Sequence, residues 1–76
     1  MGANIPRAFG RVLRDHRKKA KLSQESLALA AGIDRTFVSL LERGQRQPTL
    51  TTVFQLASVL GVSPGTLVTR TAAGVE

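Results

Sequence analysis

The sequence predicts an all-α domain built from five helices. Apolar residues recur at helical spacing in five segments, and capping residues, glycines and prolines separate those segments. The 76 residues are enough for one domain, and an apolar fraction of 42% is enough for a small core. Because a core of this size is marginal, a second copy of the chain is an expected source of further stability.

The first two helices are expected over residues 6–20 and 24–31. Pro6 suits a first helical position, where no N–H partner is needed. One face of the first helix then carries Phe9, Val12, Leu13, His16 and Ala20. Ser23 is a natural N-cap for the second helix, and Gly32 is suited to the left-handed conformation that ends it. Residues 1–5 are expected to form a flexible N-terminus.

Three further helices are expected over residues 35–43, 50–60 and 64–70. Their starts are marked by Asp34, Thr49 and Ser63, which are good N-caps. In the fourth helix, the apolar residues are expected to share one face, with Leu56 at its margin. That face consists of Leu50, Val53, Phe54, Ala57 and Leu60. The domain is therefore expected to span residues 6–70, followed by a fraying tail over 71–76.

The second and third helices, joined by a tight turn at Gly32, have the layout of a helix-turn-helix. In that motif the second helix lies in the DNA major groove. The charge agrees with this interpretation, because 11 Lys and Arg face 5 Asp and Glu, a net charge of +6. Residues 1–22 contain seven of the basic residues and only one acid, Asp15. Such a basic block could bind phosphate, bind acidic lipid or increase solubility, and the adjacent motif favours phosphate binding.

The sequence offers no basis for catalysis or metal binding. It contains no Cys and a single histidine, His16, which is expected to lie at the edge of the core. Five scattered carboxylates provide no nucleophile, base and orienting group in a set. We therefore expect no enzyme activity, no metal and no cofactor. No apolar run approaches the roughly 20 residues that span a bilayer, so we expect no membrane role and a cytoplasmic location.

Short motifs recur in order along most of the chain. They are LRxxR from residue 13, LSQExLA from 22, GID from 32, VxxLERG from 38, Pro48, LAxxLGV from 56 and Leu67. With these motifs the chain closely resembles the Cro/C1-type, or XRE, family of helix-turn-helix proteins. The resemblance implies a compact lambda-repressor-like fold that binds pseudo-palindromic double-stranded DNA as a homodimer. It further implies a transcriptional repressor or autoregulator, as in phage-type repressors, restriction–modification controller proteins and antitoxins.

The third helix is the expected reading helix. At about 100° per residue, Val38 and Leu41 point into the domain while the opposite side points outward. The expected base contacts are Arg35, Thr36, Ser39 and Leu40. A guanidinium at the helix start can bind guanine O6 and N7, or else a phosphate. Leu40 departs from the often polar residue of the family, and either touches a thymine methyl or widens the apolar edge.

Phosphate contacts are expected on either side of the reading helix. Helix N-termini attract phosphate, and the resemblance implies backbone contact by Gln24 and by the loop after the third helix. The expected set is Ser23, Gln24, Phe37, Arg43, Gln45, Arg46 and Gln47. For Ser23 the alternative is capping alone, and for the loop it is simple solvation. Phe37 is expected mainly as a core aromatic whose backbone N–H remains compatible with phosphate contact.

Two further sets of contacts are expected within and between chains. The resemblance implies an ion pair between Arg17 and Glu42, which would fix the orientation of the reading helix. By elimination, a dimer interface would fall on the fourth and fifth helices. Its expected residues are Phe54, Val59, Leu67 and Val68, and the alternative places all four in the core.

Two other functions compete with sequence-specific regulation. One is an antitoxin-type or other protein-interaction module, although the segment after Arg70 is short for a toxin-binding element. The other is non-specific nucleic-acid binding through the first helix alone. RNA polymerase is a further possible partner, through exposed Glu25.

Overall fold

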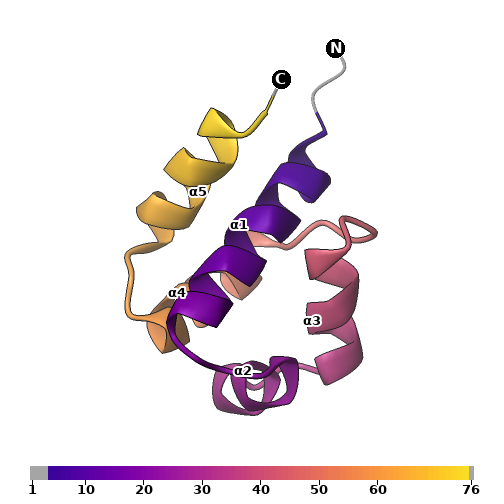
Figure 1. Cartoon of the computed structure of the whole chain (residues 1–76), viewed down its shortest axis with the longest axis vertical. Coiled ribbons are helices and arrows are strands. Elements are labelled where there is room, and N and C mark those ends of the chain that lie inside the picture. Colours follow the sequence, from indigo (N-terminus) through magenta and orange to yellow (C-terminus); the bar gives the residue numbers. More distant parts are fainter. Residues whose placement is uncertain (1–3, 76) are drawn as a thin grey trace.

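The computed structural model describes residues 4–75, which form five α-helices and no strand (Figure 1). The helices are α1 (Ile5–Lys19), α2 (Gln24–Ala31), α3 (Arg35–Glu42), α4 (Leu50–Leu60) and α5 (Pro64–Ala73). This confirms the predicted all-α five-helix fold. Of the predicted flexible N-terminus, residues 1–3 lie outside the described part, as does Glu76 at the other end.

Helix α1 lies between α3 and α5 and contacts both (Figure 1). It begins one residue earlier than predicted, because the side chain of Asn4 accepts a hydrogen bond from the backbone N–H of Arg7 at 3.1 Å. It ends at Lys19, since Lys21 adopts a left-handed conformation with φ 60° and turns the chain towards α2. Ala20 is therefore exposed, and its predicted place on the buried face is wrong.

The turn between α2 and α3 forms as predicted. The Ser23 hydroxyl accepts a hydrogen bond from the backbone N–H of Ser26 at 2.9 Å and so caps α2. Gly32 ends that helix with φ 72°, a conformation that a side chain would strain. Asp34 then caps α3 by accepting from the backbone N–H of Thr36 at 3.3 Å. These local contacts place two short helices in succession with almost no connecting loop.

The buried face of α4 differs from the predicted one. Thr52, Val53, Leu56 and Ala57 are buried, whereas Leu50 is 72% and Phe54 59% exposed. Leu50 and Phe54 therefore do not share the buried face of Val53 and Ala57, and the alternative that places Phe54 in the core is excluded. The reason is geometric, because α4 packs against α2 and α5 along one stripe, and these two side chains lie about 100° round the helix from it.

Helix α5 continues beyond the predicted end at residue 70 and reaches Ala73. Thr71 is buried, and its hydroxyl donates a hydrogen bond to the Leu67 carbonyl at 2.7 Å. This side-chain bond within the helix satisfies the hydroxyl, so Thr71 can pack inward. The predicted fraying tail is consequently wrong for residues 71–73.

Each helix contributes one fully buried leucine to the core. These residues are Leu13, Leu27, Leu41, Leu56 and Leu67, all with no solvent exposure. Burying a leucine side chain contributes on the order of 1.5–3 kcal/mol. The five leucines therefore tie all five helices to one centre, and they leave the outer faces of the helices free for other uses.

Candidate nucleic-acid interface

Helix α3 has one face in the core and the opposite face in solvent. Val38 and Leu41 have no exposed surface, as the helical periodicity predicts. Arg35 and Thr36, at the start of the helix, are exposed, and so is Arg43 at its end. The start of a reading helix is where side chains meet base edges in helix-turn-helix proteins. The outer face of α3 therefore presents a guanidinium and a hydroxyl at the helix start, where such side chains can reach base edges.

The remaining predicted reading residues are only partly exposed. Ser39 and Leu40 are half-buried, as is Phe37, which packs against the hydrophobic core. The side chain of Phe37 thus serves the fold, and only its backbone N–H, in the first turn of α3, remains for an anion. Leu40 keeps enough surface for an apolar contact beside the polar side chains.

Arg17 and Glu42 form the ion pair that joins α1 to α3. Arg17 Nε donates to Glu42 Oε2 at 2.6 Å and its Nη2 donates to Oε1 at 3.0 Å, so the pair is bidentate. The two side chains are only 11% and 4% exposed. The hydrogen bond to Glu42 raises the pKa of Arg17, burial opposes that rise, and the carboxylate charge adds to it. Arg17 Nη1 also donates to the Leu22 carbonyl at 2.9 Å, which extends the contact to the start of the helix-turn-helix.

Gln24 belongs to the same network, which the sequence analysis did not predict. Its amide Nε2 donates to Glu42 Oε1 at 3.0 Å. The carboxylate of Glu42 thus binds both α1 and α2 and holds α3 against them. Because an amide nitrogen carries two hydrogens, one donor of Gln24 remains for a phosphate. The sequence signal was present in the LSQE motif, but the partner became visible only in three dimensions.

A glycine brings α1 unusually close to the end of α3. A Cβ placed on Gly10 would lie 2.5 Å from the Leu41 carbonyl oxygen and 2.6 Å from that of Glu42. Both obstacles are backbone atoms, which cannot move aside like the end of a side chain. Gly10 therefore sets the distance between α1 and the reading helix, alongside the Arg17–Glu42 pair.

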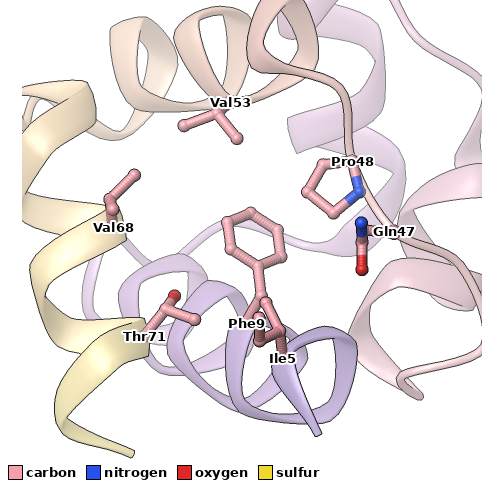
Figure 2. A pocket seen from close by; sticks show the side chains of 7 residues that line it. All are labelled: Ile5, Phe9, Gln47, Pro48, Val53, Val68 and Thr71. Atoms are coloured by element: carbon pink, nitrogen blue, oxygen red, sulfur yellow. The ribbon is translucent and has the colours of Figure 1, made fainter. Parts of the chain in front are cut away.

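The loop after α3 carries the other predicted phosphate-binding residues. Gln45, Arg46 and Gln47 are all exposed. Gln47 also lies with Pro48 at the edge of an apolar groove of about 180 Å³, above Phe9 (Figure 2). The loop therefore follows directly on α3, and its polar side chains face solvent.

The predicted dimer residues divide into exposed and buried ones. Phe54 is 59% and Val68 51% exposed, and Val59 is half-buried against the core. Leu67 has no exposed surface. Its predicted place at an interface is therefore wrong, because it is the α5 contribution to the core. Leu50 on α4 is also exposed and adds to the apolar surface.

His16 is the single histidine, and it lies at the edge of the core. Its Nε2 is buried without a hydrogen-bond partner. Burial lowers the pKa of His16, the cations Arg70 and Lys19 lower it further, and Asp15 partly opposes them. Among residues 4–75, no three His, Asp or Glu side chains come together in a way that could hold a metal ion.

Within that same stretch, no helix taken singly has the length and apolarity to cross a membrane. The pair formed by α4 and α5 meets those criteria only with a bend of 106° between them.

The five-helix fold, with α3 exposing one face as the second helix of the motif, defines a helix-turn-helix DNA-binding domain. Residues 13–67 match the family model described as helix-turn-helix (HTH_3). Since this is more than half of the chain, the protein belongs to that family, the DNA-binding transcription regulators of Cro/C1 (XRE) type.

Relatives of this chain are restriction–modification control proteins and other regulators. The chain is 37% identical to the control protein C.BamHI of Bacillus amyloliquefaciens over 75 residues, covering 97% of this chain and 93% of the relative. The restriction–modification controller protein C.AhdI from Aeromonas hydrophila superposes with a TM-score of 0.80 at 42% identity, covering 82% and 94% of the two chains. The biofilm master regulator SinR, in a complex with DNA, superposes with a TM-score of 0.76 at 30% identity, covering 79% and 97%.

Proposed function

We propose that this protein is a sequence-specific DNA-binding transcriptional regulator that reads the major groove with α3 as a homodimer. The observation that carries the proposal is the division of α3 into a fully buried face and an exposed face. Three neighbouring groups, Arg17, Gln24 and Gly10, fix the position of that helix. A rigidly held helix with free outer side chains is what base recognition requires.

Each outer side chain of α3 has a distinct proposed role. Arg35 donates to guanine O6 and N7 in the major groove. Thr36 and Ser39 donate to or accept from base edges, and the exposed part of the Leu40 side chain contacts a thymine methyl. These contacts specify the sequence, whereas phosphate contacts position the domain.

Phosphate contacts would flank the reading helix on both sides. On one side, the start of α2 offers backbone N–H groups, the N-cap residue Ser23 and the remaining amide hydrogen of Gln24. On the other side, Arg43 and the loop side chains of Gln45, Arg46 and Gln47 are exposed. The backbone N–H of Phe37 completes the set.

Dimerisation is proposed through the exposed apolar residues of α4 and α5, namely Phe54, Val68 and the half-buried Val59. A two-fold axis there would place two reading helices about one DNA turn, ~34 Å, apart on a pseudo-palindromic site. A protein of this kind could repress a promoter, its own included, by occupying it.

Selection from random duplexes at physiological salt tests the proposal. We expect a pseudo-palindromic site bound about 10³-fold or more above bulk DNA, with two chains per duplex in sedimentation. Arg35→Ala should lose preference at one position per half-site, at a cost of about 1–3 kcal/mol. Arg46→Ala, a matched control, should weaken all sequences alike and reduce the salt slope by about 1. Recovery of no preferred sequence would contradict the proposal.

A further inference from the structure

Arg7, in the first turn of α1, lies directly against the beginning of the loop that follows α3. A Cβ placed on Gly44 would come within 2.9 Å of the Arg7 Cα and within 3.3 Å of both its Cβ and its Cγ. The stem of the Arg7 side chain therefore passes over Gly44, while the residue as a whole is exposed. Gly44 has φ 72°, so a glycine here serves both the turn of the loop and the close approach of α1.

Two further arginines stand at the same place. Arg43 precedes Gly44 in the chain, Arg46 follows two residues after it, and both are exposed. Because consecutive Cα atoms are about 3.8 Å apart, the Cα atoms of both arginines lie within about 8 Å of that of Gly44. Arg7 is far from them in the sequence, and only the packing of α1 beside α3 brings the three residues together. We call Arg7, Arg43 and Arg46 the arginine cluster.

The charge of the arginine cluster is not compensated within residues 4–75. The acid next to Arg43 in the sequence, Glu42, is 4% exposed and paired with Arg17 at 2.6 Å, and no ion pair of the described chain includes a member of the cluster. Arg7 also stands where a cation opposes the helix dipole, and the first turn of α1 contains no acid. Like charges gathered without a partner repel one another, so the cluster indicates an external anion.

Position distinguishes Arg7 from other cations of α1. Arg11 is turned towards α5, because its Nη2 donates to the Gly74 carbonyl at 3.3 Å. Lys19 lies at the opposite end of the helix, where its Nζ is 3.8 Å from a carboxylate oxygen of Asp15. Of these three cations, Arg7 is the one that contacts the loop after α3.

We propose that Arg7 binds a backbone phosphate of the same duplex that α3 reads, beside the phosphates bound by Arg43 and Arg46. A guanidinium suits this role, since its planar group binds phosphate oxygens bidentately. The inference rests on the proposed function, which places α3 and its loop on DNA, and it adds a contact from α1, outside the helix-turn-helix. Such a contact positions the domain on the duplex and carries no sequence information of its own.

The salt dependence of DNA binding by the full chain tests the inference. Arg7→Gln removes the charge but keeps the Cβ and Cγ that pack over Gly44. We expect it to bind the selected operator and an unrelated duplex about tenfold more weakly, with the salt slope smaller by about 1 per chain. The ratio of the two affinities should not change. The Tm should not decrease, because the lost cation opposed the helix dipole.

Two variants serve as controls for Arg7→Gln. Lys19→Gln removes the same charge at the other end of α1, and it should keep the wild-type salt slope and an affinity within about twofold of the wild type. Arg7→Lys keeps the charge at the same position, and it should keep the salt slope while losing part of the affinity, because an ammonium cannot bind bidentately.

Operators that carry one uncharged methylphosphonate at a time locate the contact. At one position per half-site, the replacement should weaken binding by the wild type but hardly affect binding by Arg7→Gln. That position should neighbour those at which Arg46→Ala becomes insensitive. Lys19→Gln should respond like the wild type at every position.

Several results would overturn the inference. They are a wild-type salt slope for Arg7→Gln, equal losses for Arg7→Gln and Lys19→Gln, or equal effects of every methylphosphonate on the wild type and Arg7→Gln. A lower Tm with an unchanged slope would assign Arg7 to packing on Gly44 alone. If selection yields no operator, the slopes are compared on an unrelated duplex, because a phosphate contact does not require a preferred sequence. The inference and the proposed function can therefore fail separately.

Discussion

The two sides of α1 are joined to their neighbours in different ways. Towards α3, the contact consists of a bidentate, nearly buried ion pair and a glycine against backbone carbonyls. Towards α5, the polar contacts are an exposed pair between Asp15 and Arg70 at 3.6 Å and a bond from Arg11 to the Gly74 carbonyl at 3.3 Å.

The difference matters because the two kinds of contact constrain different things. Apolar burial holds helices together but tolerates small rotations, whereas a bidentate ion pair and a backbone contact fix an orientation. The helix proposed to read DNA is the one held by directional contacts. Helix α5 is held mainly by the buried residues Leu67 and Thr71, which is enough for a scaffold.

Breaking the Arg17–Glu42 ion pair should have the largest effect on stability and on operator binding. Arg17→Ala leaves Glu42 almost buried with only Gln24 as a polar partner, and removal of one member of a buried pair costs about 3–5 kcal/mol. We expect a large loss of stability in chemical denaturation, and weaker operator binding by the fraction that remains folded.

A double variant separates orientation from stability. Arg17→Met with Glu42→Leu should restore much of the stability, because apolar replacement of a buried pair is often neutral. Operator affinity should stay reduced. Wild-type affinity in folded Arg17→Ala protein would show that the pair does not orient α3.

Widening the gap between α1 and α3 should have the next largest effect. Gly10→Ala places a methyl group against two backbone carbonyls, and such overpacking costs about 1–3 kcal/mol. Thermal unfolding should show a lower Tm, with a parallel loss of operator affinity. Gly65→Ala is the matched control in α5, because its Cβ would lie 3.7 Å from the Ser63 Oγ, an ordinary contact. Equal behaviour of the two variants would contradict the close-approach argument.

The smallest effect on stability should come from protonation of His16, on the α5 side of α1. Burial first, then Arg70 and Lys19, lower the pKa of His16 below its usual 6.5. The folded protein therefore binds this proton less readily than the unfolded chain does. The resulting stability is present above about pH 6.5 and declines as the pH falls through that value towards the lower folded pKa.

Thermal melts between neutral and mildly acid pH measure this effect. The Tm of the wild type should decrease as the pH is lowered, and the Tm of His16→Leu should change less over the same range. Identical pH dependence in the two proteins would show that His16 is not responsible.

Much of the architecture was predictable because its signals are local. Ser23, Asp34, Thr49 and Ser63 each act on an N–H two or three residues away, so the sequence alone locates the helix starts. The predicted periodicity of α3 was confirmed by the full burial of Val38 and Leu41.

The errors arose where a neighbouring helix decides which side is covered. Leu50 was grouped with Val53 and Ala57 on one face, and Leu67 was placed at an interface; only packing shows that Leu50 is exposed and Leu67 is buried. Residues 71–73 were assigned to a tail because small residues give a weak signal, yet the bond from Thr71 to Leu67 lets the helix continue.

The sequence by itself determined five helices, the N-caps of four of them, the helix-turn-helix arrangement and the surplus of positive charge near the N-terminus, since caps, spacing and charge are properties of neighbouring residues. The tertiary structure alone decided that Gln24 completes the Glu42 network and that Gly10 sets the approach of α1 to α3. It also decided which side of α1 leaves its cations in solvent. Those features depend on residues far apart in the chain, and only packing brings them together.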